Sequence, residues 1–184
     1  MSEATARVVL HEEVSRDEVE RAAAAHGWLL ANIVPATDER PFQLAYLGRD
    51  EADVLLYVDD AKLPARYLIL RGDVERGARE VRASLHAYTP EELRALLEQP
   101  ADTQARVRGL HYAALALGAL DRDAVLGASR AALAHGDPKV RGAALWGAGF
   151  AGFCELREPV RKMASRDRDA VLRGRARTLA EGWG

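Results

Sequence analysis

Only a few residues of this chain have side chains suited to chemistry: five histidines and a single cysteine. No two histidines stand four residues apart, the spacing that places two imidazoles on one helix face to hold a metal. His11 forms a lone His-Glu pair with Glu12, and His26 and His135 each precede a glycine where a helix is predicted to end. An imidazole at that position suits the last carbonyls of a helix. We therefore predict no metal site and no cofactor.

Nucleophilic chemistry finds little support in the sequence. Cys154 is the single cysteine, so it can form no disulfide within the chain. We predict that it packs between Phe153 and Leu156, since a cysteine nucleophile needs a partnering base. Adjacent residues on a strand point to opposite faces, so the neighbouring acids Glu12-Glu13 and Asp59-Asp60 are not expected to form catalytic pairs. We predict that they lie in solvated turns.

Gly147, Gly149 and Gly152 are interpreted as packing or turn glycines, because no strand precedes them as a dinucleotide-binding loop would require. The chain also lacks the Gly-Xaa-Ser-Xaa-Gly elbow of serine hydrolases. These patterns predict a protein that is not an enzyme and that has no catalytic residues.

Composition is that of an ordinary globular protein, and its Ala, Arg and Gly content suggests a bacterial source. No run of about 18 apolar residues is present, and the first residues do not resemble a secretory signal, so we expect a cytoplasmic protein.

Residues 1–100 carry 12 basic and 19 acidic side chains, and residues 101–184 carry 14 basic and 9 acidic ones, which gives net charges of −7 and +5. This asymmetry predicts a boundary near Gln99-Pro100, with domains 1–99 and 100–184.

The first domain is predicted to be α+β. Ser15 and Glu18 have the spacing of a capping box, and the helix that they begin should end near His26-Gly27. Helices are also expected after Asp73 and, with Pro90 in its first turn, after Thr89. Short β-branched and aromatic runs separated by turn residues, one of them 48–51, predict a mostly antiparallel sheet with helices on one face. The expected strands are 7–10, 28–34, 42–47, 53–58 and 66–70.

The second domain contains an internal repeat. The phrase Val-Arg-Gly or Leu-Arg-Gly occurs at 107–109, 140–142 and 172–174. A period in this range is typical of stacked helical units, none of which can bury its apolar face alone. We predict about two and a half units, in which the helix carrying this phrase comes first and a second helix follows at 123–134 and at 156–165.

The segment Asp137 to Gly149, Asp-Pro-Lys-Val-Arg-Gly-Ala-Ala-Leu-Trp-Gly-Ala-Gly, resembles the short prokaryotic HEAT-like repeat that also occurs in phycobilisome-lyase-type proteins. In that family an Asp-Pro pair opens the first helix and a Val-Arg pair lies in its first turn. The resemblance covers about residues 102–181 and implies a C-terminal α-helical HEAT-like array, an α solenoid with a tendency to bind proteins. It implies that arginines tie neighbouring repeats to acidic partners; the matching residues are Arg108, Arg141 and Arg173, with Asp137 and Asp169 as acceptors.

Two surface features could bind a partner. A run of basic residues includes Arg157, Arg161 and Lys162, and Arg130 lies on the preceding second helix. The run can be a solvated helix face, a patch for an acidic protein, or a weak nucleic-acid patch, although acidic residues interrupt it. Trp146 and Phe150, four residues apart, share a helix face and either fill the core between repeats or anchor a partner.

These patterns favour a non-enzymatic adaptor that binds a partner protein through the helical repeats; an immunity or regulatory protein is one variant of such an adaptor. The alternative is a lyase-like or chaperone-like protein that handles a cofactor or pigment, with His111, Tyr112 and Trp146 lining a cleft. A second alternative is weak nucleic-acid binding.

Overall fold

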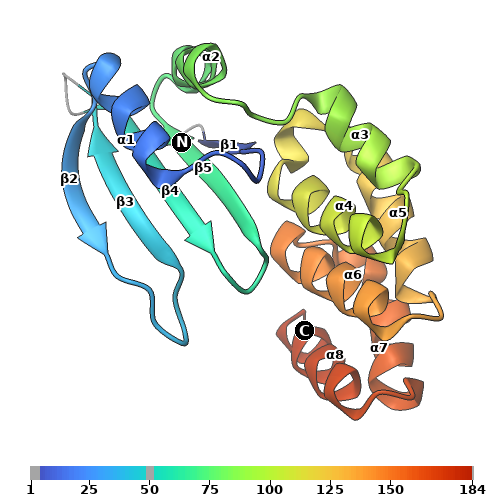
Figure 1. The fold of residues 1–184 in the computed structure, drawn as a ribbon. Helices are drawn as coiled ribbons and strands as arrows, with labels where there is room; N and C mark the ends of the chain where they lie inside the picture. The colour runs from blue at the N-terminus through green and yellow to red at the C-terminus, as the bar shows by residue number, and fades with distance from the viewer. Residues whose placement is uncertain (1–4, 49–51, 184) are drawn as a thin grey trace. The chain divides into compact units, whose positions relative to one another are not determined.

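The computed structural model describes residues 5–48 and 52–183, and the chain divides into two compact units, Met1–Tyr88 and Thr89–Gly184 (Figure 1). We call them the sheet unit and the helical unit. The division lies before the boundary expected at 99/100. The reason is that helix α3 (Pro90–Glu98) packs against α4 (Thr103–Leu115), so it belongs with the helices that follow it. Among the described residues, no helix combines the length and the apolar character that crossing a membrane requires.

The sheet unit is built on a five-stranded antiparallel sheet, as its alternating sequence predicted. The strand order is β1-β5-β4-β3-β2, so the first strand pairs with the last, and consecutive strands from β2 to β5 pair as hairpins. The expected turn at 48–51 lies partly outside the described residues. The strands are β1 (Thr5–Val9), β2 (Leu29–Val34), β3 (Phe42–Leu47), β4 (Val54–Asp60) and β5 (Ala65–Arg71).

One face of this sheet forms the core of the unit. Alternate residues of the central strands point to that face, as the period of two in a strand requires, and most of them are buried. Helices α1 (Arg16–Ala25) and α2 (Val74–Ser84) cover it, α1 through Val19 and Ala23 and α2 through Val81. The buried strand residues include Leu44, Tyr46, Leu55, Tyr57, Leu68 and Leu70.

Local hydrogen bonds set the helix boundaries of the sheet unit. The Ser15 hydroxyl accepts from the Glu18 N–H, and the Glu18 carboxylate accepts from the Ser15 N–H, which confirms the predicted capping box. The helix ends at His26, and Gly27 adopts the left-handed conformation (φ 77°) that glycine tolerates without a steric penalty.

Asp53 is a buried carboxylate that joins the start of β4 to the start of α2. Its side chain accepts a hydrogen bond from the Asp73 N–H and forms an ion pair with Arg76. Asp73 caps α2 by accepting from the Arg76 N–H.

Replacing Asp53 by alanine is expected to destabilise the sheet unit by about 2 kcal/mol. The Asp73 N–H would lose its partner at a partly buried position, which costs about 1–3 kcal/mol. Hydrogen exchange of the first-turn amides of α2 would measure the loss. Asp59→Ala is the matched control, because its ion pair with Arg66 is more exposed and contributes about 0–1 kcal/mol. Equal protection in the two variants would contradict the prediction.

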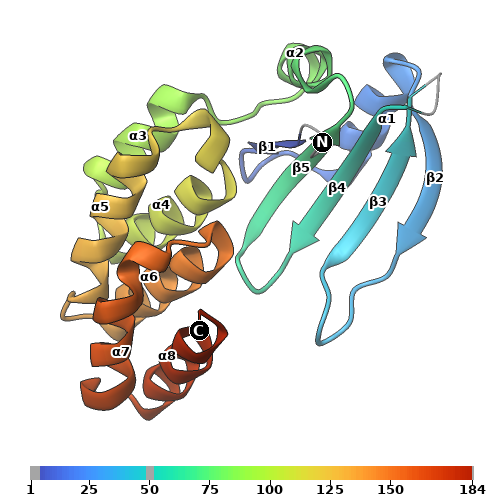
Figure 2. The same cartoon turned by 180° about the vertical axis from the view of Figure 1, so that it is seen from behind.

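The helical unit contains six α-helices in its described residues. Helices α3 and α4, α5 and α6, and α7 and α8 pack as three successive hairpins. One row consists of α4, α6 and α8, and the other of α3, α5 and α7, as Figure 2 shows from behind. The remaining helices are α5 (Arg122–Leu133), α6 (Pro138–Ala151), α7 (Arg157–Arg166) and α8 (Ala170–Gly182).

This pairing changes how the repeat is divided. The positions of the helices at 123–134 and 156–165 were predicted well, but the helix that carries the Val-Arg-Gly phrase is the second of each hairpin and not the first. Consequently α8 does not stand as a half unit; it packs closely against α7. The sequence period identifies the repeating length, whereas only packing identifies which neighbours form a pair.

Small residues let neighbouring helices within the row of α4, α6 and α8 approach each other. A Cβ added at Gly147 of α6 would lie 3.3 Å from the Ala114 Cβ of α4, and one added at Gly149 would lie 3.1 Å from Leu179 of α8. Gly152 caps α6 in the left-handed conformation. The interpretation of these glycines as packing and turn residues is confirmed. Large buried side chains, among them Phe153, Leu156 and Val160, complete the core.

Candidate functional site

The arginine of the repeated phrase joins consecutive hairpins. Arg141 of α6 donates from Nε and Nη2 to the two carboxylate oxygens of Asp167, at 2.7 and 2.8 Å, in the loop between α7 and α8. Both side chains are largely buried, with exposed fractions of 12% and 4%. Hydrogen bonds from Arg141 hold the pKa of Asp167 below its ordinary value, so the carboxylate stays charged.

The acceptor therefore differs from the residues that the resemblance implied. Asp137 and Asp169 are the N-caps of α6 and α8, and each accepts from backbone N–H groups of its own helix. Asp167 is the acidic partner of Arg141 instead. It lies two residues before the N-cap of α8, and this position brings it within reach of the preceding hairpin. It also accepts from the Asp169 N–H at 2.8 Å, which fixes its orientation.

The third repeat reuses the same local geometry. Arg173 Nη1 donates to the carbonyls of Asp167 and Arg168, six and five residues before it, just as Arg141 Nη1 donates to those of His135 and Gly136. Arg141 and Arg173 therefore each hydrogen-bond to the loop that precedes their own helix. Arg141 in addition binds the next hairpin through Asp167. Arg108 holds the same place in the repeated phrase, but it is the sixth residue of α4, two positions deeper in its helix than Arg141 and Arg173 are in theirs.

The predicted basic residues lie on the row formed by α5 and α7. Arg130 is exposed in the last turn of α5, and Arg161 and Lys162 are exposed on α7. Arg161 pairs with Glu158 at 3.2 Å, so part of its charge is neutralised. Arg157, the first residue of α7, is half-buried. The row thus presents fewer unscreened cations than the sequence suggested.

The aromatic pair lies outside the main core of the helical unit. Trp146 and Phe150 of α6 stack with ring centroids 4.8 Å apart, and the ring of His111 on α4 meets Trp146 edge-on at 5.2 Å. Phe150 is 39% exposed, and Trp146 is half-buried. Tyr112, by contrast, is fully buried.

An apolar pocket does occur, but in the sheet unit. It lies between α1, α2 and the sheet, and Val19, Trp28, Leu68 and Val81 are among its lining residues. His111, Tyr112 and Trp146, which a cofactor or pigment cleft would need, do not line it.

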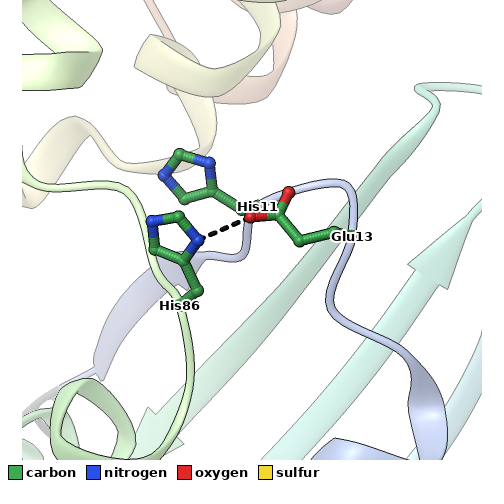
Figure 3. Close-up of side chains that lie close together, drawn as sticks. All are labelled: His11, Glu13 and His86. Atoms are coloured by element: carbon green, nitrogen blue, oxygen red, sulfur yellow. Dashed lines mark hydrogen bonds and ion pairs between the residues drawn. The ribbon is translucent and has the colours of Figure 1, made fainter.

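Sequence reasoning missed a cluster of two histidines and a glutamate in the sheet unit. His11 follows β1, Glu13 lies in the next turn, and His86 follows α2 (Figure 3). The potential ligand atoms of the three side chains all lie within 4.8 Å of one another. The His86 Nδ1 and the Glu13 Oε1 are 2.5 Å apart, and the rings of His11 and His86 stack at 3.7 Å. No local motif could reveal a cluster whose histidines are so far apart in the sequence.

The remaining reactive residues are explained by local structure. His26 is the C-cap of α1 and contacts the Ser84 hydroxyl at 2.7 Å, and His135 Nδ1 accepts from the Asp137 N–H. Cys154 is exposed, so the prediction that it packs in the core was wrong. It lies in a short 3-10 turn (Cys154–Leu156) that buries Leu156 and directs the cysteine outward.

Comparison of the chain with family models, with curated proteins and with solved structures finds no match.

Proposed function

We propose that this protein is a non-enzymatic adaptor whose helical unit, a short HEAT-like array, binds an acidic partner protein through the row of α5 and α7. The observation that carries the proposal is the exposed pair Arg161 and Lys162 on α7, with Arg130 on the adjacent α5. Stacked helical hairpins of this kind extend a surface without needing a closed pocket, which suits protein recognition.

A buried ion pair between hairpins supports this interpretation. Arg141 and Asp167 join the second hairpin to the third, which carries the cations of α7. A preformed surface loses less conformational freedom on binding than a flexible one. Charge complementarity then contributes to the rate of association and to the choice of partner.

Charge reversal on α7 is expected to remove the partner. The double variant Arg161→Glu/Lys162→Glu should weaken binding at least about tenfold, or ~1.4 kcal/mol, because it converts attraction to an acidic surface into repulsion. The assay is a quantitative pull-down from the native host with nuclease-treated lysate, followed by a titration with the purified partner at two salt concentrations.

The matched control is Arg79→Glu/Arg82→Glu, which reverses two exposed arginines on α2 of the sheet unit. One protein lost in the α7 variant and retained in the control is the expected result. An unchanged set of partners would contradict the proposal, and so would a partner lost upon nuclease treatment, which would point to nucleic acid instead.

A further inference from the structure

The backbone holds His11 and His86 opposite each other. Leu10 and Ala87 form an antiparallel bridge, the His11 N–H donates to the His86 carbonyl at 3.0 Å, and the Tyr88 N–H donates to the Val9 carbonyl at 2.9 Å. Directly opposed residues on an antiparallel pair have Cβ atoms about 4.5–5.5 Å apart on the same face. The two imidazoles are therefore neighbours because of the main chain, and not through a chance meeting of flexible side chains.

A tight turn brings the carboxylate to the same place. The Val14 N–H donates to the His11 carbonyl at 3.1 Å, which closes a turn around Glu12 and Glu13. Arg66 Nη1 holds the turn from the sheet by donating to the carbonyls of Glu12 and Val14, at 3.2 and 2.8 Å. Arg66 also pairs with Asp59, which offsets its charge near the cluster.

We propose that His11, Glu13 and His86 form a binding site for a divalent transition-metal ion such as zinc. Two imidazoles and one carboxylate are the ligand types that zinc prefers, with bonds of about 2.0–2.2 Å. The ligand atoms lie within 4.8 Å of one another, so rotation of the side chains can bring them to one ion. An imidazole-rich set favours zinc, copper or nickel over the oxygen-preferring calcium and magnesium.

Metal binding must rearrange the rings. The His11 ring now stacks on His86 at 3.7 Å and on Tyr88 at 3.8 Å, nearly parallel to both. Parallel stacked rings cannot both direct an in-plane nitrogen lone pair at one ion. One ring therefore turns when the ion binds, and the ion replaces the contact between His86 Nδ1 and Glu13.

The site has a simple proton balance. The metal needs neutral imidazoles, so any proton on His11 or His86 is released to solvent as the ion binds. The Glu13 carboxylate is charged at neutral pH, as an ordinary glutamate is, and hydrogen bonds, first from its own backbone and then from His86, lower its pKa further.

The test is a calorimetric titration of the full, tag-free chain with zinc chloride. Wild type should bind one ion per chain, and His86→Ala should bind it at least about tenfold more weakly, since even residues that only orient ligands contribute 10–100-fold. His26→Ala is the matched control, because His26 lies in the same unit but outside the cluster. The His86 side chain is 60% exposed, so its removal should leave the fold intact.

Two further measurements keep the proposal falsifiable. Glu13→Gln preserves the shape of the side chain and should also weaken zinc binding. If His86→Ala fails to fold, the zinc affinity of Glu13→Gln tests the proposal in its place. The imidazole proton resonances of His11 and His86 should shift on zinc addition as the stack opens. Absence of binding by the wild type, or equal affinity in the wild type, both cluster variants and the control, would overturn the proposal.

Discussion

Replacing Asp167 by alanine is expected to destabilise the helical unit by about 3–4 kcal/mol, because removing one partner of a buried ion pair leaves the other charge uncompensated. Arg141 is only 12% exposed and would lose both carboxylate contacts. Hydrogen exchange of amides in α6 and α8 is the preferred measurement, since it reports on this unit even if the sheet unit unfolds separately.

An exposed ion pair in the same hairpin provides the control. Glu158 and Arg161 of α7 form an ion pair with side-chain exposed fractions of 81% and 52%. Glu158→Ala should therefore change stability very little. If Asp167→Ala were no more harmful than Glu158→Ala, the buried pair would not stabilise the contact between hairpins.

The same pair gives the helical unit a dependence on acid pH. The pKa of Asp167 is lower in the folded protein than in the unfolded chain, chiefly through hydrogen bonds from Arg141. Its stabilising contribution is therefore complete above the unfolded pKa, near about 4, and is lost as the pH falls through the folded value. Between neutral pH and strong acid, Asp167→Ala should lose less stability than the wild type does.

Replacing Gly109 by alanine is expected to destabilise the contact between α3 and α4 by about 3 kcal/mol, at the upper end of the usual cost of overpacking. A Cβ at this position would lie 2.5 Å from the Leu96 carbonyl oxygen of α3. That atom belongs to the backbone of a helix, so it cannot move aside as a side chain could. The measurement is chemical unfolding, supported by hydrogen exchange of α3 and α4.

The third copy of the repeated phrase supplies a control with the opposite sign. Gly174 of α8 has nothing within 4 Å of an added Cβ. Gly174→Ala should therefore stabilise its helix by up to about 1 kcal/mol, the difference in helix propensity between the two residues. Similar effects at Gly109 and Gly174 would show that these glycines serve a role other than close packing.

The comparison of Gly109 with Gly174 shows what a repeat in sequence can and cannot predict. The recurring phrase identified three equivalent helix positions. It did not indicate that only the first of them touches a neighbouring backbone, because that depends on how closely the helices pack. The pairing of α7 with α8 was missed for the same reason.

The sequence by itself determined the features that depend on short-range hydrogen bonds and periodicity. Ser15 with Glu18 forms the predicted capping box, a helix begins after Thr89 as expected, and the alternating runs became an antiparallel sheet. Partners only three residues apart meet whenever the helix begins, so the residue types are sufficient.

Only the tertiary structure decided which distant groups meet. Arg141 forms its ion pair with Asp167 rather than with Asp137 or Asp169, and His11 lies opposite His86. Both outcomes depend on the register of a strand or the packing of a hairpin, where a displacement of one residue turns a side chain to another face. Such long-range alignment results from the burial of the whole core, and no local pattern in the sequence contains it.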